Sequence, residues 1–397
     1  MKNSTQIHAP KSLLFAIIPA FAAVILFALT PKTALADTIH SSTYYQELRD
    51  SYEARIEAGE EVDLDDPAIA EVYDMADNSD HTNITDELEE TGKVTLVSGE
   101  KYYLSKKIYL DKGNTINAKK AKIFATGRIF ECNYSVKGYK KLKATVSGGI
   151  WRYDGSGGHK LTAMQFSHVN GITFRNMNIK YCNYSGHTFE FIACKNVTVK
   201  NCKIRCYGKA GSTSVEEQIQ LDIDAPATAP TTGVHNGKCC TNVKIIKCNI
   251  TGCRAVCANY AATDRGRYLK KFHKNITVKN CTLTGKSAEA LALFNVTGAT
   301  VTGNKITTKA PTSRNSYSDG MAITYFGSGA SGGKYTIKNN TIKGGRHSLL
   351  MYSHASSTFG SVTIKNNKLY CKSGSSNALK TSSVSSLSSS GNKTYSW

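Results

Sequence analysis

Proline and tryptophan are scarce in this sequence, with 7 and 2 residues among 397, and aromatic residues together make up 9%. Hydrophobic residues still account for 40%, which excludes a wholly disordered chain, and the length excludes a small disulfide scaffold. Only one long apolar run occurs, so a multi-pass membrane protein is excluded as well. Length alone suggests two or three domains, but a single repeat fold can reach the same size.

Acidic residues are rare over most of the chain. Residues 91–397 hold 12 Asp and Glu against 45 Lys and Arg, whereas residues 37–90 hold 18 acidic residues and only two basic ones. The formal net charge of +20 therefore divides into an acidic segment and a strongly basic body. We expect the acidic segment to lie on the body through charge attraction, and the body to attract polyanions.

The first 36 residues have the pattern of an export signal. Lys2 and Lys11 precede an apolar run from Ser12 to Thr30, and Ala34-Leu35-Ala36 forms a small-x-small cleavage site. The run approaches the length of a membrane span, so an uncleaved anchor is the alternative. In both cases we expect the rest of the chain to lie outside the cytoplasm, either secreted or retained at the cell surface.

Residues 37–91 carry helical signals and form a predicted N-terminal segment. Tyr44, Leu48, Tyr52 and Ile56 recur at helical spacing after Ser41, which can cap the first turn. A glycine and a proline then interrupt the pattern before a second amphipathic stretch. An exposed acidic tail is the alternative to a helical arm that caps the end of the body.

From about residue 92 apolar and polar residues alternate, and a repeat appears. Its clearest copies are Gly171–Ile179, Asn196–Ile204, Asn242–Ile250 and Asn275–Leu283. Weaker copies follow toward the C-terminus, and the shortest step, from Cys281 to Asn304, is 23 residues. Insertions lengthen the other steps, which is typical of stacked coils. Alternation with period two predicts strands, and asparagine at equivalent turns tolerates a left-handed backbone and can form hydrogen bonds along the stack. The predicted fold is all-β, a parallel β-helix over residues 92–397.

The resemblance to a known family lies in three segments. Gly148–Gly155, His187–Phe191 and Gln218–Asp222 together resemble the pectin-lyase-like superfamily of right-handed parallel β-helices, and within it secreted bacterial relatives of polygalacturonases. The resemblance covers about residues 92–397. It implies the fold and leaves the activity open, because that superfamily contains hydrolases, lyases, epimerases and non-catalytic adhesins.

Twelve cysteines in an exported chain commonly form disulfides. Here Cys202, Cys248 and Cys281 occupy one position of the repeat, and Cys194 and Cys240 another, so each set should stack at the strand spacing of about 4.8 Å. That separation permits a disulfide, but we favour a ladder of buried thiols. No Cys-x2-Cys pair has metal spacing, which argues against a zinc site.

The few carboxylates of the body cluster at one strand. Alternation along Glu217–Asp224 predicts that its isoleucines and leucine face the core, while its amides and carboxylates project outward in one row. Such a row can bind sugar hydroxyls, hold a hard cation or transfer protons, and a solvated strand face is the alternative. The predicted catalytic residues are Asp222, Asp224 and Glu217, with Gln218 and Gln220 as predicted substrate-binding residues.

Neighbouring coils should extend this face. Phe294, Phe326 and Tyr352 are expected to point outward beside the carboxylates, and aromatic faces stack on sugar rings. Insertions after Tyr260 and over residues 225–237 are long enough to wall a groove, and arginines in such loops suit carboxylate recognition by paired hydrogen bonds. The remaining predicted substrate-binding residues are Asn259, Asp264, Arg265, Arg267 and His187.

The resemblance to polygalacturonases is incomplete where their chemistry lies. Their Asn-Thr-Asp motif would fall on the coil of Asp222, but their next coil carries an Asp pair where this chain has Gly252-Cys253-Arg254, and their Gly-His-Gly loop has no clear match. Inverting hydrolysis needs an acid and a base about 6.5–9.5 Å apart, a distance that Asp222 and Asp224 could meet. A lyase would instead use a basic residue and a cation such as Ca²⁺.

The sequence therefore predicts an exported, monomeric β-helix protein that acts on or binds an acidic polysaccharide, such as a polyuronate or an anionic wall glycan. Hydrolysis and β-elimination are the enzymatic alternatives, and a non-catalytic surface adhesin is the binding alternative. Neither a nucleic acid nor, after signal cleavage, a membrane is a predicted partner. Ca²⁺ is a predicted cofactor for the lyase alternative alone.

Overall fold

The computed structural model describes residues 38–132, 140–153, 162–180, 186–205, 217–230, 232, 235–262, 266–309, 313 and 316–397. The predicted export signal lies outside these residues, so its presence and cleavage stay predictions. Within the described residues, no helix combines the length and the apolar character needed to cross a membrane.

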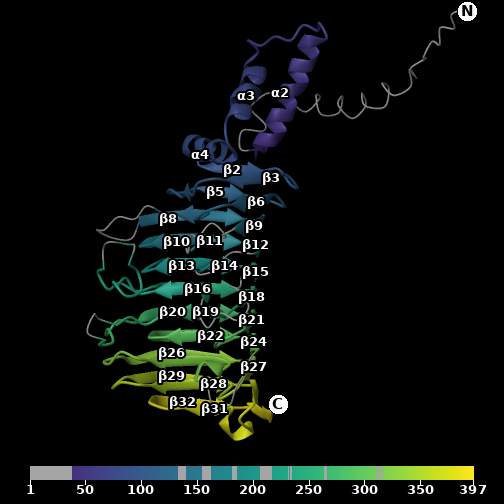
Figure 1. Cartoon of the computed structure of the whole chain (residues 1–397). Helices are drawn as coiled ribbons and strands as arrows, with labels where there is room; N and C mark the ends of the chain where they lie inside the picture. The colour runs from purple at the N-terminus through teal and green to yellow at the C-terminus, as the bar shows by residue number, and fades with distance from the viewer. Residues whose placement is uncertain are drawn as a thin grey trace, which may run out of the picture.

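Three parallel sheets run the length of the molecule and enclose one core (Figure 1). Sheet A contains β1 (Thr38–Ile39), β2 (Lys93–Leu96), β5 (Thr115–Asn117), β8 (Lys140–Ser147), β11 (Val169–Arg175), β14 (Lys195–Lys200), β17 (Thr241–Ile246), β20 (His273–Lys279), β23 (Val296–Thr302), β26 (Ser331–Lys338), β29 (Thr358–Lys365) and β32 (Val384–Ser390). Sheet B contains β3 (Lys101–Leu104), β6 (Lys122–Ala125), β9 (Ile150–Tyr153), β12 (Asn178–Lys180), β15 (Lys203–Arg205), β18 (Asn249–Gly252), β21 (Thr282–Gly285), β24 (Lys305–Thr308), β27 (Thr341–Gly344), β30 (Lys368–Cys371) and β33 (Lys393–Ser396). Sheet C contains β4 (Ile108–Tyr109), β7 (Phe130–Glu131), β10 (Met164–Ser167), β13 (Phe189–Ile192), β16 (Glu217–Asp222), β19 (Arg254–Ala258), β22 (Leu291–Phe294), β25 (Met321–Tyr325), β28 (Leu349–Ser353) and β31 (Leu379–Thr381).

Each coil contributes one strand to each sheet, in the order A, B, C, and successive coils pair in parallel register. In sheet A, for example, Ile172 lies opposite Val197, which lies opposite Val243, and all three side chains are buried. Because side chains alternate across a strand, such inward rows fill the core, and burying each Val or Ile stabilises the fold by about 1.5–3 kcal/mol. The predicted β-helix is confirmed.

Two ladders of asparagine side chains tie the turns of neighbouring coils together. In the interior ladder, Oδ1 of Asn340 accepts the backbone N–H and the side-chain amide of Asn304, both at 2.9 Å, and Asn367 does the same for Asn340. In an exposed ladder, the amide of Asn196 donates to Oδ1 of Asn170 at 2.7 Å. Other asparagines at these turns take the left-handed conformation. The predicted role of asparagine in the turns is confirmed.

Cysteine takes the interior turn position on three earlier coils. The backbone N–H of Cys248 donates to Sγ of Cys281 at 3.4 Å, and Cys202, Cys248 and Cys281 are all buried. The N–H of Cys281 then donates to Oδ1 of Asn304 at 2.8 Å, so the thiol ladder continues directly into the asparagine ladder. The ten cysteines among the described residues are free thiols, which confirms the predicted stack of buried thiols.

The acidic N-terminal segment folds into three helices. They are α2 (Ser42–Glu57), α3 (Pro67–Asp77) and α4 (Asp80–Glu90). The predicted cap Ser41 accepts the N–H of Tyr44 at the start of α2. α2 and α3 pack against each other through Leu48 and Val72, and together they extend away from the coil stack (Figure 1).

Helix α4 closes the N-terminal end of the core. Ile84 and Leu88 join the main hydrophobic cluster, and the carboxylate of Asp80 accepts the backbone N–H groups of Ser42 and Tyr103, each at 2.6 Å. A stacked-strand core needs such a cover at its exposed end. The segment is thus joined to the body by apolar packing and backbone hydrogen bonds, whereas the sequence had suggested charge attraction.

Candidate functional site

The outward row predicted on β16 exists, but it is not solvated. Ile219 and Leu221 are buried in the core, so Gln218, Gln220 and Asp222 project from the opposite face of sheet C. These three outward side chains are nevertheless only 2%, 7% and 0% exposed. The alternation was therefore predicted correctly, and the open strand face was not.

Amides and carboxylates alternate along this face from coil to coil. Glu131, Gln165, Glu190 and Gln220 lie opposite one another on β7, β10, β13 and β16. The side-chain amide of Gln165 donates to Oε2 of Glu190 at 2.7 Å, so neighbouring coils are linked by polar side chains as well as by the backbone. The row becomes apolar on the following coils, where Cys257, Ala292 and Ala322 continue it.

Asp222 lies at the centre of the enclosed polar face. The amide of Gln220 donates to both of its carboxyl oxygens, at 3.1 and 2.9 Å, and the amide of Asn259 donates to Oδ1 at 3.4 Å. Burial raises the pKa of Asp222 well above its ordinary value, and the nearby carboxylates of Glu190 and Glu217 raise it further, against the two amides. Asp222 is therefore held toward its neutral, protonated form.

Glu217 belongs to a buried ion network that the sequence did not reveal. The guanidinium of Arg254 donates to Glu217 at 2.5 Å and to Glu289 at 2.6 Å, and all three side chains are less than 10% exposed. Burial lowers the pKa of Arg254, but Cys257 and the two carboxylates outweigh it and raise that pKa, so the cation is retained. One arginine thus bridges three consecutive coils and holds two carboxylates in fixed positions.

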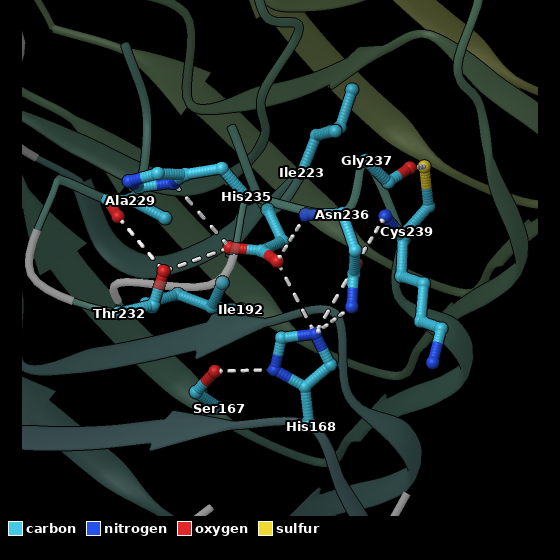
Figure 2. A network of polar contacts seen from close by, with 12 residues as sticks. Ser167, His168, Ile192, Ile223, Ala229, Thr232, His235, Asn236, Gly237 and Cys239 are labelled. Carbon is cyan, nitrogen blue, oxygen red and sulfur yellow. Dashed lines mark hydrogen bonds and ion pairs between the residues drawn. The ribbon is translucent and has the colours of Figure 1, made fainter. Parts of the chain in front are cut away.

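Asp224 does not join the row of β16, contrary to the prediction. Its carboxylate accepts the hydroxyl of Thr232 and the backbone N–H of Asn236, both at 2.8 Å, and lies 3.3 Å from Nε2 of His168 (Figure 2). His235 approaches it at 3.8 Å. Because β16 ends at Asp222, the chain has already turned into the following loop, and Asp224 anchors that loop instead of facing a groove.

The contacts of Ser167, His168 and Asp224 resemble those of a catalytic triad, in which the nucleophile contacts a base and the base contacts an orienting acid. Oγ of Ser167 lies 2.7 Å from Nδ1 of His168, whose Nε2 faces Asp224 (Figure 2). All three side chains are completely buried, and Asn236 also contacts the imidazole. A substrate could not reach Ser167, so the three groups serve as a structural network that fixes the loop to β10.

An aromatic patch flanks the polar face. It consists of Tyr260, Tyr268, Phe326, Tyr352 and His354. The ring of Phe326 stacks on Tyr260 at 4.0 Å and on His354 at 4.8 Å, and Tyr268 lies 5.4 Å from it. Tyr268 is 46% and Tyr352 38% exposed, so the patch presents ring surface to solvent. Phe326 and Tyr352 face outward as predicted.

Phe294 and Asn259 connect the aromatic patch to the polar face. The ring of Phe294 is largely buried beneath Phe326 at 5.3 Å, and the guanidinium of Arg254 lies 5.6 Å from the same ring. The backbone carbonyl of Asn259 accepts from Nε2 of His273 at 2.9 Å. The prediction that Phe294 points outward is correct, but its ring supports the patch and exposes little surface.

The predicted loop residues are only partly placed. Arg267 is exposed beside Tyr268, whereas Asp264 and Arg265 lie outside the described residues. Nδ1 of His187 is 3.0 Å from the carbonyl oxygen of Glu217 and 3.6 Å from its carboxylate. His187, Glu217, Gln218, Gln220, Asp222 and Asn259 therefore come together, while Asp224 is bonded within its own loop. Their roles stay predictions.

Sequence reasoning missed Arg254 and Glu289 as members of this cluster, and Tyr260, Tyr268 and His354 as members of the patch. The signal for Arg254 was present, because its place opposite Glu217 follows from aligning β16 with β19. In the described part of the chain, no group of three or more His, Cys, Asp or Glu side chains is placed to hold a metal ion.

Comparison with solved structures finds distant likenesses. No family model and no curated protein matches this sequence. The chain itself forms a parallel β-helix of three sheets. PfbA, a surface adhesin of Streptococcus pneumoniae, is similar at 13% identity over 80% of this chain and 90% of that one, with a TM-score of 0.49. An exopolygalacturonase of Thermotoga maritima is similar at 12% identity over 73% and 76%, with a TM-score of 0.42.

A third similar structure is the A-module of the mannuronan C-5 epimerase AlgE6 of Azotobacter vinelandii, at 13% identity over 81% of this chain and 96% of that module, with a TM-score of 0.38. At these identities and TM-scores the likenesses carry no argument about function, which has to be argued from this chain's own residues.

Proposed function

We propose that this protein lies outside the cytoplasm and binds an acidic polysaccharide at the aromatic patch, without cleaving it. The observation that carries the proposal is the exposed ring surface of Tyr268 and Tyr352, which contact the rings of Phe326 and His354 at centroid distances of 5.4 and 4.7 Å respectively. Flat aromatic surfaces of this kind pack against the apolar faces of sugar rings. Exposed Arg267 and Lys270 on the adjoining loop supply positive charge for the carboxylates of such a polymer.

The state of the carboxylates supports binding over catalysis. A general acid or base must come within hydrogen-bond reach of the substrate, but Asp222 is fully enclosed and Asp224 is bonded to its own loop. Glu217 is neutralised by Arg254. Each predicted catalytic group thus already has a structural partner, which favours the adhesin-like alternative over hydrolysis or elimination.

A substrate screen tests the proposal directly. The protein is incubated with polygalacturonate and alginate, with and without Ca²⁺, and three signals are followed: bound polymer, absorbance at 235 nm and new reducing ends. We expect binding with neither chemical signal. Unsaturated product would identify a lyase, and reducing ends alone would identify a hydrolase; either result would overturn the proposal.

Variants locate the binding surface. Measured at 300 mM NaCl to suppress general charge effects, Tyr352→Ala and Tyr268→Ala should each weaken polysaccharide binding about 3–10-fold, the equivalent of one lost ring contact. Tyr103→Ala is the matched control, because Tyr103 is 53% exposed and stacks on Phe124 in sheet B, away from the patch. Equal affinity of all three variants and the unmodified protein would show that the polysaccharide does not bind at the patch.

A further inference from the structure

Basic residues follow the corner between sheets A and B along the C-terminal two thirds of the coil stack. Every coil from β11 to β33 crosses this corner in a two-residue turn, and each turn is flanked or occupied by at least one cation. We call this set the basic ridge. It consists of Arg175, Lys200, Lys203, Lys247, Lys279, Lys305, Lys338, Lys365, Lys368 and Lys393.

Strand register fixes the spacing of the ridge. Arg175 lies directly opposite Lys200, Lys338 opposite Lys365, and Lys368 opposite Lys393 on adjacent coils. Neighbouring parallel strands are about 4.8 Å apart, so positive charges recur at about that interval over roughly 34 Å. All ten side chains are exposed or half-buried. The ridge is therefore a band of accessible cations along the A–B corner, to which each coil contributes from the end of its sheet A strand, from the turn or from the start of its sheet B strand.

Nothing of opposite sign interrupts this line. Across the described strands of sheets A and B from β11 onward, neither Asp nor Glu occurs. The carboxylates of these coils project from sheet C or its flanking loops, as Glu190, Glu217, Asp222 and Glu289 do. The A–B corner does not border sheet C. Cations this close repel one another, and a bound polyanion would relieve that repulsion.

A row of hydroxyl groups runs beside the ridge on sheet A. Six threonines occupy equivalent, half-buried outward positions on sheet A, each two residues before the end of its strand. They are Thr173, Thr198, Thr277, Thr300, Thr336 and Thr363. A threonine hydroxyl both donates and accepts hydrogen bonds, as sugar hydroxyls do. The flat face next to the cations is thus polar, and Lys244 adds one more cation where it takes the threonine position on β17.

We infer that the basic ridge and its hydroxyl row bind an extended anionic polysaccharide lying parallel to the coil axis, on a surface separate from the aromatic patch. Nine of the ten ridge cations are lysines, which act as point charges without the fixed geometry of arginine and so tolerate carboxylate or sulfate groups at varied angles.

Charge-matched variants of the full chain test the inference. The ridge variant carries Lys200→Gln, Lys203→Gln, Lys365→Gln and Lys368→Gln; the control carries Lys274→Gln, Lys309→Gln, Lys334→Gln and Lys372→Gln, four exposed lysines away from the corner. At 50 mM NaCl the ridge variant should bind heparin and polygalacturonate about 10–100-fold more weakly and show a shallower salt dependence, while the control should lose less than about 3-fold.

Several results would overturn the inference. Equal losses in the two variants would mean that net charge alone attracts the polymer, and an unchanged ridge variant would place binding elsewhere. Duplex or single-stranded DNA that displaces the polysaccharide at a lower charge concentration would show that the polymer class is wrong. Lysine acetylation of the unmodified protein gives a second readout: bound heparin should protect Lys200, Lys279 and Lys365 but not Lys309.

The proposals for the ridge and for the aromatic patch can be refuted independently of each other. At 300 mM NaCl a line of exposed charges contributes little, so the residual binding measured there depends on Tyr352 and not on the ridge lysines. At 50 mM NaCl, Tyr352→Ala should retain most of its heparin binding.

Discussion

Lowering the pH should destabilise this protein through one buried imidazole. His273 is completely buried; its Nδ1 accepts the backbone N–H of Cys240 at 3.1 Å, and its Nε2 donates to the carbonyl of Asn259 at 2.9 Å. Nδ1 can accept that bond only while it is unprotonated. Burial lowers the pKa of His273 to about 4, against the opposing effect of its bond to Asn259.

The magnitude follows from the two protonation equilibria. In the unfolded chain the imidazole takes up its proton near pH 6.5, whereas in the folded chain it does so only near pH 4. Between these values the unfolded state binds more protons, so stability falls as the pH falls. The stabilisation is fully present above pH 6.5 and declines by about 3 kcal/mol by pH 4.

His273→Gln isolates this contribution, because glutamine does not titrate. Guanidinium unfolding, followed by the fluorescence of the buried Trp151, gives the free energy of unfolding of both proteins at pH 7 and pH 4. The stability advantage of the unmodified protein over the variant should shrink by about 3 kcal/mol between these pH values. Groups shared by both proteins, Asp222 among them, cancel in this difference. A difference that does not change with pH would refute the assignment of a neutral, buried imidazole.

Two further substitutions probe the polar face and the turn ladder. Asp222→Asn should leave polysaccharide binding unchanged. As the pH rises from 4 to 8, the variant should gain stability relative to the unmodified protein, because a carboxyl group with a raised pKa destabilises the folded state when it ionises. A loss of about 10²–10⁴ in a measurable turnover would instead identify Asp222 as a catalytic group. Cys248→Ser should cost about 1–3 kcal/mol in the free energy of unfolding by placing a hydroxyl among buried thiols. Rapid labelling of Cys202, Cys248 and Cys281 in the folded protein would contradict the ladder.

The strands of sheets A and B could be predicted because one short sequence pattern determines both which side chains face inward and where the coil turns. Alternation in Asn196–Ile204 decides which side chains are inward, and a two-residue turn, in most coils with Asn at one or both positions, marks where the coil turns. Because the copies share the alternation and the turn, a strand that is ambiguous in one copy can be assigned from the others. The ladder from Cys281 to Asn304 shows that position in the repeat mattered more than residue type.

The site could not be predicted to the same depth, because it depends on contacts between coils at the irregular edges of sheet C. The pairing of Arg254 with Glu217 and Glu289 joins residues 37 and 35 positions apart along the chain, across insertions of unequal length. Likewise, nothing in the alternation of β16 indicates that Asp222 is enclosed, since an outward side chain can be covered by a loop from another coil. Outward orientation is a property of the strand, whereas exposure is a property of its neighbours.

The position of Arg254 decides how the carboxylates of sheet C are held. Its coil follows that of Asp222. A carboxylate in its place would stand among Glu217, Asp222 and Glu289 without a counterion, and like charges buried together resist ionisation. An arginine at this place instead forms an ion pair with one carboxylate on each side and holds both in fixed positions. One residue therefore makes this part of sheet C a rigid support, and it does so beside Phe294, the ring on which the aromatic patch rests.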